Sequence, residues 1–335
     1  MKQRLAEDRA RAAQQLQRLY APVRKELDAV EESLLAEFQN DDQFVDRLAR
    51  HGFRLGGKRL RPALLLLSGR ACGELVRAHT DLATVLEMIH TATLLHDDVL
   101  DEATLRRHLD TVNARWDNET SVILGDYLFA RALCLASSVE DGFASRELHD
   151  ASRVMCEGEL RQIESRGDYS LTEEQYYDIV RGKTAAFTAS CCRLGAHFSG
   201  ADAESAEALA RYGQHLGVAF QIADDLLDVL GDEAKVGKSL GTDLLKQKST
   251  LPVIRLLEQA SPEARSRLVA QLHSSDNHRR ETLRPYWDNS DSLVYAREKA
   301  VVFSQLAVQQ LDVLPPSPAR DSLCGLAEFV VSRQH

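Results

Sequence analysis

The sequence predicts an all-α fold, and three observations point to it: the distribution of proline, the choice of residues and the spacing of apolar side chains. The chain has 335 residues but only eight prolines, and none lies between Pro62 and Pro252. Proline breaks helix interiors, so a long stretch without it suits stacked helices. The same stretch is rich in Ala, Leu, Glu, Arg and Gln, the better helix formers. No convincing run has the alternating, β-branched pattern of a strand.

The boundaries of the elements follow from where the helical pattern stops. Residues 1–34 are expected to form a helical extension ahead of the main bundle. Before the first of two aspartate motifs, a helix is indicated by apolar or small residues at helical spacing, namely Leu82, Val85, Leu86, Ile89, Ala92 and Thr93. Breaks are expected near residues 140–143, 166–170, 199–202, 231–251 and 274–292. They leave about ten or more helices. Since no Pro-, Gly- or Ser-rich linker divides the chain, we expect one domain over residues 1–335.

Composition and charge exclude several classes of protein. The chain is 44% hydrophobic and 27% charged, as in a globular protein with a sizeable core. Its uninterrupted apolar stretches, such as residues 63–67, are far shorter than the roughly 20 residues of a membrane span. The N-terminal segment lacks the apolar core of a secretory signal, and the six cysteines have no CxxC or metal-binding spacing. We therefore expect a cytoplasmic protein with reduced thiols, and the net charge of −10 argues against nucleic-acid binding.

A short aspartate motif occurs twice, and it is the strongest functional signal in the chain. Residues 97–101 read DDVLD and residues 224–228 read DDLLD, each inside an otherwise apolar helical run. The first and last aspartates of each copy are four apart, so they project from one face of a helix. The carboxylates are those of Asp97, Asp98, Asp101, Asp224, Asp225 and Asp228.

Carboxylates at this spacing suit a hard cation such as Mg²⁺, which takes one or two protein carboxylates and completes its shell with phosphate and water. One such motif alone is more often a solvated acidic face. Two copies, both interrupting apolar helices, favour a metal site instead. Two clusters facing each other across a cavity can hold several Mg²⁺ ions around one diphosphate and stabilise the charge that develops when it leaves.

Positive charge gathers at a few places in this acidic chain. Residues 56–62, GGKRLRP, place two glycines and three cations just before a helix, the pattern of an anion-binding helix entry. Arginine can bind a diphosphate with two parallel hydrogen bonds, and lysine adds a compact point charge. The remaining candidates are Arg106, Arg107, Lys183 with Thr184, Lys238 and Lys248. Together with the six aspartates they predict a site for two diphosphates.

These motifs together resemble the trans-isoprenyl diphosphate synthase (polyprenyl synthetase) family. The landmarks occur in family order: GGKRLRP, IHTATLLHDDVLD followed by RR, GDYLFARAL, GKTA, FQIADDLLD, GKSLGTDL and KSTLP. The resemblance covers residues 35–331 and points to the long-chain members, such as octaprenyl diphosphate synthases. It implies a single isoprenoid synthase-like helical bundle around a central cavity, a homodimer, and about three Mg²⁺ ions per site with substrate bound.

Carried over residue by residue, the resemblance gives each motif a role. All six aspartates match the family's metal-binding positions. The isopentenyl diphosphate pocket matches Lys58, Arg61, His90 and Arg107. The groups around the allylic diphosphate and the developing cation match Arg106, Lys183, Thr184, Gln221, Lys238 and Lys248. Two positions depart from the family, because His108 and Gln247 stand where most members have glycine, but neither change removes a charged group.

The implied reaction is an Mg²⁺-dependent head-to-tail condensation of isopentenyl diphosphate with an allylic diphosphate. The allylic diphosphate departs, the double bond of isopentenyl diphosphate attacks the carbocation, and a proton is lost. In members with short products, an aromatic residue four or five positions before the first motif closes the product tunnel. Here that face offers Thr93, Ala92, Ile89 and Leu86, the nearest two small, so we expect a product of about C30 to C45. Release of such a lipid can involve peripheral contact with a membrane.

Four alternatives remain open. The first is a short-chain synthase, making farnesyl or geranylgeranyl diphosphate, because the stripe before the first motif says nothing about product length if it is only core packing. A regulatory subunit of a heteromeric synthase typically lacks one aspartate motif, whereas this chain has both. A terpene cyclase needs no second diphosphate pocket, so Lys58 and Arg61 argue against it. An HD-type phosphohydrolase built on His96 and Asp97 leaves the second aspartate motif unexplained.

Overall fold

The structure is a computed structural model that describes residues 2–55, 57–140, 142–231, 241–274 and 279–332. It confirms the all-α fold. Three short 3₁₀ or π segments are labelled η. In chain order the helical elements are α1 (Lys2–Leu19), η1 (Ala21–Val23), α2 (Arg24–Glu37), α3 (Gln43–Arg54), α4 (Leu60–Cys72), α5 (Arg77–Leu100), α6 (Val112–Arg115), α7 (Asn118–Ser137), α8 (Gly142–Glu164), α9 (Glu173–Val180), η2 (Arg181–Ala185), α10 (Ala186–Phe198), α11 (Ala203–Leu230), α13 (Thr242–Leu245), α14 (Leu251–Gln259), α15 (Pro262–His273), α16 (Arg279–Asp288), α17 (Ser292–Gln310), η3 (Leu311–Val313) and α18 (Pro318–Ser332).

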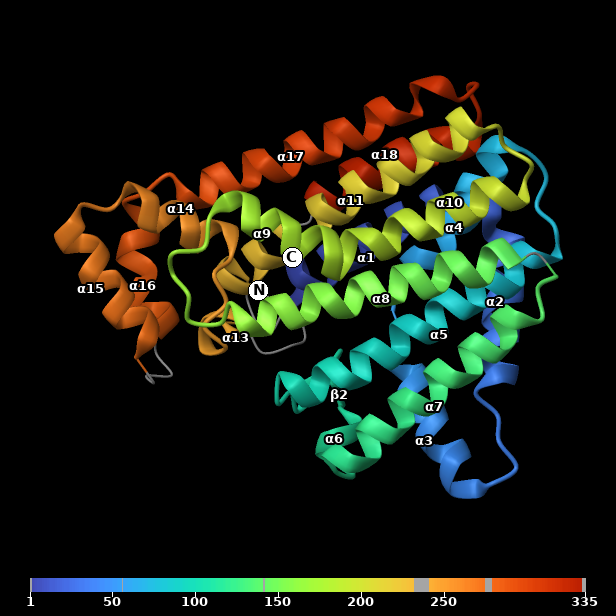
Figure 1. Cartoon of the computed structure of the whole chain (residues 1–335), viewed down its shortest axis with the longest axis horizontal. Coiled ribbons are helices and arrows are strands. Elements are labelled where there is room, and N and C mark those ends of the chain that lie inside the picture. The colour runs from blue at the N-terminus through green and yellow to red at the C-terminus, as the bar shows by residue number, and fades with distance from the viewer. Residues whose placement is uncertain (1, 56, 141, 232–240, 275–278, 333–335) are drawn as a thin grey trace.

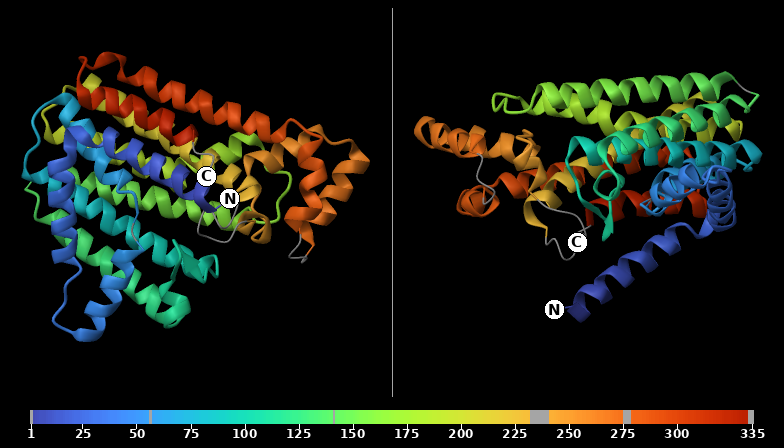
Figure 2. Two further views of the ribbon diagram at one scale, coloured as in Figure 1. Left: turned by 180° about the vertical axis from the view of Figure 1, so that it is seen from behind. Right: turned by 90° about the horizontal axis from the view of Figure 1, so that it is seen from below.

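The long helices run side by side along the length of the molecule (Figure 1). α5 packs against α7, α4 and α2, and α11 packs against α17 and α10. The middle of α5 is buried on all sides, since residues 82–89 all lie inside the core. α1 and α8 lie on opposite sides of this bundle (Figure 2). α5 and α11, the helices that carry the two aspartate motifs, are therefore interior elements with many supporting neighbours.

Close contact between α10 and its neighbours depends on glycine. A Cβ atom at Gly195 would strike the backbone carbonyl of Leu65 in α4, and one at Gly213 or Gly217 would strike residues of α10. Because glycine has no Cβ, the backbones can approach where a larger residue would hold them apart. α10 is thus fixed between α4 and α11, and α4 begins with the basic loop.

Four short helices, α13 to α16, gather at one end of the bundle and contribute to a small core of their own (Figure 1). The break expected over residues 274–292 is wrong, because α16 spans most of it. Its sequence is polar and contains a proline, but Leu283 and Trp287 are buried. The buried Arg279 guanidinium donates to the Leu244 carbonyl at 2.7 Å. Tertiary packing therefore overrides a weak helical pattern.

A small hairpin follows α5, although the sequence indicates no strand. β1 (Leu105–Arg106) pairs antiparallel with β2 (Leu109–Asp110). The turn residues Arg107 and His108 have φ angles of 53° and 65°, as in the mirror-image turns that suit a hairpin with a two-residue loop. Strands of two residues cannot show an alternating pattern, so no strand is predicted here.

Helix α7 presents an apolar surface to solvent. By length and composition alone it is apolar enough to cross a membrane, and 33% of its apolar window is buried inside the protein. Val122 and Ile123 are 39% and 61% exposed. The expectation that apolar stretches fall short of a membrane span rested on uninterrupted runs, and α7 is interrupted by Asp126 and Arg131. Its exposed apolar side chains form a candidate contact surface.

Candidate active site

The two aspartate motifs meet at one end of the bundle. The first lies in the last turn of α5, whose C-cap is Asp101, and the second lies in the last turns of α11. Lys248 connects them, because its Nζ is 3.6 Å from an Asp101 carboxylate oxygen and 3.1 Å from one of Asp243. The Asp243 backbone amide in turn donates to the Asp228 carboxylate at 3.1 Å. Segments far apart in the chain thus form one charged site.

Asp98 is bound to an arginine of the hairpin. Its side chain is fully buried, and Arg106 Nη2 lies 2.8 Å from its Oδ1. Burial raises the pKa of Asp98, and the Arg106 guanidinium opposes that rise. The hairpin is itself tied to the end of α5, because Thr111 and Asn113 both donate to the carbonyl oxygen of Ala103. Asp98 and these two anchors together fix the position of Arg106.

The second and third aspartates of the α11 motif also have protein partners. Asp225 receives hydrogen bonds from the Tyr176 hydroxyl at 2.6 Å and from the Gln221 amide at 2.9 Å. Asp228 accepts hydrogen bonds from the first residues of α13. Burial, and then repulsion by Asp243, raises the pKa of Asp225. Donors from separate elements therefore compensate these buried carboxylates.

Asp97 has no hydrogen bond or ion pair with another described residue. Burial raises its pKa to about 6; Lys183 nearby lowers that pKa, and Glu159 raises it. Lys183 Nζ is 2.6 Å from a Glu159 carboxylate oxygen and 2.6 Å from the side-chain oxygen of Gln162. A cation bound beside Asp97 would stabilise the carboxylate that burial destabilises.

Lys183 and Thr184 lie in η2, a π-helical turn pressed against α8. A Cβ atom at Gly158 of α8 would strike the backbone nitrogen of Lys183, so the contact requires glycine there. The Thr184 hydroxyl donates to the Gln221 side-chain oxygen at 2.8 Å. Single π turns inside helices frequently mark functional sites, and this one presents a cation and a hydroxyl together.

A second group of charges surrounds His90. Arg61 Nε is buried without a hydrogen-bond partner in the described part of the chain, and burial lowers the pKa of Arg61. The Arg107 guanidinium donates to the Leu55 carbonyl at 2.9 Å, and burial and then repulsion by Arg106 lower its pKa. Burial and these cations hold the pKa of His90 well below its usual value, so the imidazole is neutral. Guanidiniums held from water without enough counter-ions favour an anionic ligand.

The basic loop before α4 supplies only some of its cations to this group. Arg59 forms ion pairs with Glu31 and Glu87, so its charge is largely neutralised within the protein. Lys58 Nζ lies 5.9 Å from the centre of the Phe329 ring in α18. Of the three loop cations, Arg61 is the one that lowers the pKa of His90 most.

The remaining predicted positions lie in loops beside the site. Gly57 lies directly against the Arg107 guanidinium, so a Cβ atom there would displace the end of that side chain. His108 and Gln247, the two departures from the family pattern, have φ angles of 65° and 54°, a region that favours glycine. Lys238 lies outside the described residues, and so does the first glycine of the basic loop.

Sequence reasoning missed four residues of the site: Glu159, Gln162, Tyr176 and Asp243. Asp243 had a signal, because it follows the second aspartate motif inside the segment GKSLGTDL. The other three had none. A polar pair on a helix resembles any solvated face, and a tyrosine in an apolar run resembles core packing.

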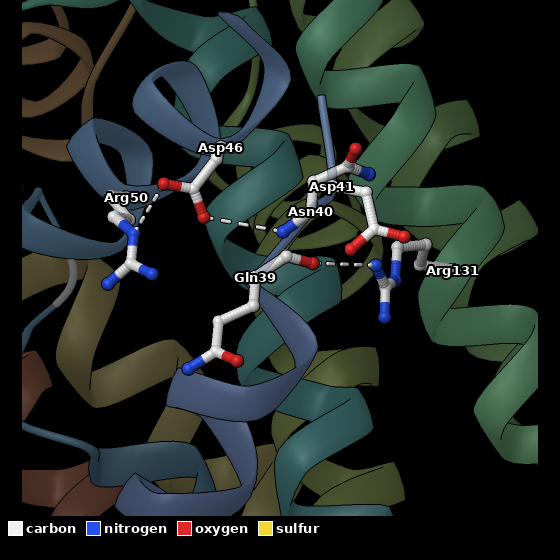
Figure 3. Close-up of a pocket in the computed structure, with 6 residues that line it drawn as sticks. All are labelled: Gln39, Asn40, Asp41, Asp46, Arg50 and Arg131. Atoms are coloured by element: carbon white, nitrogen blue, oxygen red, sulfur yellow. Dashed lines mark hydrogen bonds and ion pairs between the residues drawn. The ribbon is translucent and has the colours of Figure 1, made fainter. Parts of the chain in front are cut away.

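Two surface hollows lie away from the aspartates. One, of about 340 Å³, is lined by Gln39, Asn40, Asp41, Asp46, Arg50 and Arg131 (Figure 3). Three of its four charged side chains already have partners, because Arg50 pairs with Asp46 and Arg131 donates to the Gln39 carbonyl. The other, of about 530 Å³, lies between α14, α15 and α16. Side-chain geometry, rather than surface shape, therefore identifies the site.

The donor set of the site fits a hard divalent cation. Within the described ranges, no three His, Cys, Asp or Glu side chains converge closely enough to bind a metal by themselves. Mg²⁺ needs no such cage, since it usually takes one or two carboxylates and keeps water and phosphate oxygens as ligands. Oxygen donors without cysteine or histidine favour Mg²⁺ over zinc.

Residues 42–286 match the polyprenyl synthetase family. The chain belongs to that family. It is a prenyltransferase of isoprenoid synthesis, and the substrates of prenyl synthases are allylic and isopentenyl diphosphates. The octaprenyl diphosphate synthase of Escherichia coli is 34% identical over 92% of this chain and 96% of its own length.

Two further relatives show how widely this polyprenyl synthetase fold is used. The short chain isoprenyl diphosphate synthase of Methanothermobacter thermautotrophicus is also 34% identical, over 86% of this chain and 90% of its own length. The crystal structure of a polyprenyl synthase from Caulobacter crescentus, complexed with calcium and isoprenyl diphosphate, has a TM-score of 0.90 at 34% identity. That likeness covers 96% of this chain and 98% of the other.

In this prenyl synthase, the residues predicted to set product length lie on α5 below the first aspartate motif. Leu86, Ile89 and Ala92 are fully buried. Thr93 is partly buried, and its hydroxyl donates to the His90 carbonyl at 2.8 Å. The stripe therefore runs from the aspartates into the interior of the bundle.

Proposed function

We propose that this prenyltransferase is an Mg²⁺-dependent trans-polyprenyl diphosphate synthase with a long product. The observation that carries the proposal is that a buried cation, Arg61, and a buried carboxylate, Asp97, lie near each other and each lacks a full counter-charge. Burial lowers the pKa of the Arg61 guanidinium and raises the pKa of Asp97, and these two groups are near enough for their charges to interact. A diphosphate supplies the anion that the guanidinium lacks, and a divalent cation supplies the positive charge that the aspartate lacks.

The aspartates are proposed to divide into ligands and supports. Asp97 and Asp101 are proposed as ligands from α5, and Asp224, the first residue of its own motif, as the ligand from α11. The other three accept hydrogen bonds from Arg106, from Tyr176 and Gln221, and from α13. When bound, about three Mg²⁺ ions would neutralise charge on the departing diphosphate.

The cationic side chains are proposed to separate the two substrates. Arg106, Lys183 and Lys248 lie among the aspartates and would hold the allylic diphosphate. The isopentenyl diphosphate would bind at Arg61 and Arg107, two of the cations around His90, together with Lys58 of the basic loop. A condensation requires the reacting double bond to lie beside the carbon–oxygen bond that breaks, and two neighbouring pockets would meet that requirement.

Thr184 and Gln221 are proposed to face the cation that forms. The Thr184 hydroxyl gives its hydrogen to Gln221, so its oxygen lone pairs are available to the developing positive charge. A new carbon–carbon bond then forms to the isopentenyl double bond, and one proton is released, with the departed diphosphate as its acceptor. No side-chain nucleophile is needed.

Assembly and location form part of the same proposal. We propose a cytoplasmic homodimer in which a second copy covers the exposed apolar surface of α7, because large apolar side chains such as Ile123 gain free energy when they leave water. Release of a long lipid would bring the dimer into peripheral contact with a membrane.

A long product, about C30 to C45 with about C40 as the central value, is proposed from the size of residues 92 and 93. Overall likeness does not decide the length, since a long-chain and a short-chain relative are equally identical to this chain. Alanine and threonine next to the first motif leave the top of a product tunnel open, whereas an aromatic residue there would close it.

The test is to incubate the purified protein with Mg²⁺, radiolabelled isopentenyl diphosphate and several allylic primers, and to size the products. EDTA should abolish condensation, and Mg²⁺ or Mn²⁺ should restore it. Asp97→Ala should lower kcat at least roughly 10²-fold, whereas Lys58→Ala should mainly raise KM for isopentenyl diphosphate. Full activity in EDTA would disprove the metal dependence, and an effect of Lys58→Ala confined to the allylic substrate would reverse the two pockets.

A further inference from the structure

Tyr176, on α9, touches the second aspartate motif from the side of the protein core. Its side chain is only 4% exposed, and its hydroxyl donates to Asp225 Oδ2 at 2.6 Å. Gln221 Nε2 donates to the other oxygen, Oδ1, at 2.9 Å. Each oxygen of this buried carboxylate therefore has a donor, and the two donors come from different helices.

The orientation of Gln221 follows from this arrangement. Gln221 has its Nε2 towards Asp225, to which it donates, and its Oε1 on the other side. That Oε1 accepts the Thr184 hydroxyl at 2.8 Å. A line of hydrogen bonds thus runs from Tyr176 through Asp225 and Gln221 to Thr184, and joins α9, α11 and η2.

The neighbouring tyrosine shows that burial alone does not create this link. Tyr177 is 8% exposed, and its ring lies against that of Tyr176 with centroids 5.5 Å apart. Its hydroxyl donates to Glu173 on its own helix at 2.8 Å. Two adjacent tyrosines of similar burial therefore differ in the acceptor of one hydrogen bond, and only Tyr176 reaches the aspartates.

We propose that Tyr176 is a positioning residue whose hydroxyl holds Asp225, and with it the end of α11 that carries Asp224 and Asp228, in the geometry that binds a magnesium diphosphate. The inference rests on the proposed function. Without the hydroxyl, one buried carboxylate oxygen loses its donor and the side chain is free to turn, taking Gln221 with it. Such a change reaches the metal site without removing a ligand.

The test compares Tyr176→Phe with the matched control Tyr177→Phe in the full-length protein. Binding of inorganic pyrophosphate is measured by calorimetry at increasing Mg²⁺, and kcat and KM are measured for both substrates. Tyr176→Phe should raise the Mg²⁺ concentration for half-maximal pyrophosphate binding about tenfold and lower kcat about tenfold, because the hydrogen bond that holds one oxygen of the buried Asp225 side chain is lost. KM for isopentenyl diphosphate should stay within about twofold, and Tyr177→Phe should leave all these values unchanged.

Two results would overturn the inference. One is an equal effect of Tyr176→Phe and Tyr177→Phe. The other is a lower melting temperature of Tyr176→Phe with an unchanged Mg²⁺ dependence, because a tyrosine that only packs the core would affect stability and not metal binding. Failure of the wild-type protein to bind pyrophosphate in Mg²⁺ would instead count against the proposed function. Equal binding by wild type and Tyr176→Phe would count against this inference alone.

A second background keeps the test decisive if Tyr176→Phe does not fold. Asp225→Asn removes the carboxyl group that the tyrosine hydroxyl holds, so adding Tyr176→Phe should change the Mg²⁺ dependence by less than about twofold and leave a folded protein. If the fold-changes in Mg²⁺ dependence of the two single substitutions multiplied in the double variant, Tyr176 would not act through Asp225. Unfolding of the double variant while Asp225→Asn folds would show the same.

Discussion

Asp97 carries its charge where burial opposes it. Burial raises its pKa from 3.8 to about 6, so the folded protein holds the proton more tightly than the unfolded chain does. Below about pH 4 the group is protonated in both states and costs no stability. Stability is lost as the pH rises from about 4 to about 6, and above that range the loss is complete at about 3 kcal/mol. Above about pH 6, the ionised Asp97 side chain therefore makes the ligand-free protein less stable than an uncharged side chain would.

Asp97→Asn should stabilise the metal-free protein by up to about 3 kcal/mol near pH 8 while it removes activity. Melting temperatures measured in EDTA should show the gain, and the gain should shrink as the pH falls from about 6 to about 4. Asp150→Asn is the control, because the Asp150 side chain is 76% exposed and its substitution should change little at any pH. A gain of the same size at every pH would mean that charge burial is not its cause.

The sequence selects the aspartates as a set but does not distinguish among them. Both motifs read DDxxD, and spacing on one helix cannot reveal which carboxylate a distant residue will bind. In the structure Asp98 is bound to Arg106 and Asp225 to Tyr176, and those partners arrive from a hairpin and from α9. The roles of Asp98 and Asp225 as supports therefore depend on contacts between segments that the sequence pattern does not contain.

The two departures from the family pattern share a physical explanation. His108 and Gln247 both have positive φ angles, where a Cβ atom is crowded and where a non-glycine residue costs roughly 1–2 kcal/mol. The sequence alone shows that glycine is replaced at both positions. It cannot show that both replacements fall in left-handed turns, because that depends on the path of each loop around the site.

The π turn η2 is the element whose position depends most directly on one glycine. Gly158→Ala would push a Cβ atom into the backbone at Lys183, and either η2 or α8 would have to move. We expect a net loss of about 1–2 kcal/mol, because overpacking outweighs the better helix propensity of alanine. We also expect kcat to fall about tenfold or more, since Lys183 and Thr184 shift relative to Gln221.

Thermal melting and steady-state kinetics would check this expectation, and the same helix offers a control. At Gly142 the nearest atom to an added Cβ is the flexible end of Arg146 at 3.1 Å, so Gly142→Ala should leave both kcat and stability close to wild type. If Gly158→Ala lowered stability but left kcat unchanged, the backbone contact would support the fold without positioning η2.

Elements were predictable where the helical pattern was long. The stripe before the first motif indicated α5 because its apolar residues repeat over several turns. The helical pattern did not predict α16, because that helix depends on the packing of buried Leu283 and Trp287 against other short helices. It did not predict the hairpin either, because each strand has only two residues. Short elements take their conformation from neighbours that a local pattern cannot represent.

In the whole molecule, the interior helices α5 and α11 end close together, at the site formed by the two aspartate motifs. The glycine contacts of α10 fix α11 against it, and Lys248 then links Asp101 to Asp243 across the gap between the motifs. From this end, α5 leads back into the bundle with Ala92 and Leu86 fully buried. Leu86 is six residues farther from the aspartates, or about 9 Å along the helix, which corresponds to about two isoprene units. A growing chain that follows α5 would meet residue 92 first.

Two substitutions on this face should therefore shorten the product in a defined order. Ala92→Phe should stop elongation at about C15 to C20, and Leu86→Phe, deeper by about two isoprene units, should stop it at a longer product that is still shorter than that of the wild type. Turnover should survive in both, because neither residue is among those proposed to bind a diphosphate. Chromatography of radiolabelled products would give the lengths, and thermal melting would report the packing cost of about 1–3 kcal/mol expected if the face is filled core. An unchanged product from Ala92→Phe, the reverse order, or a wild-type product that ends at about C15 would refute a tunnel along α5 and favour the short-chain alternative.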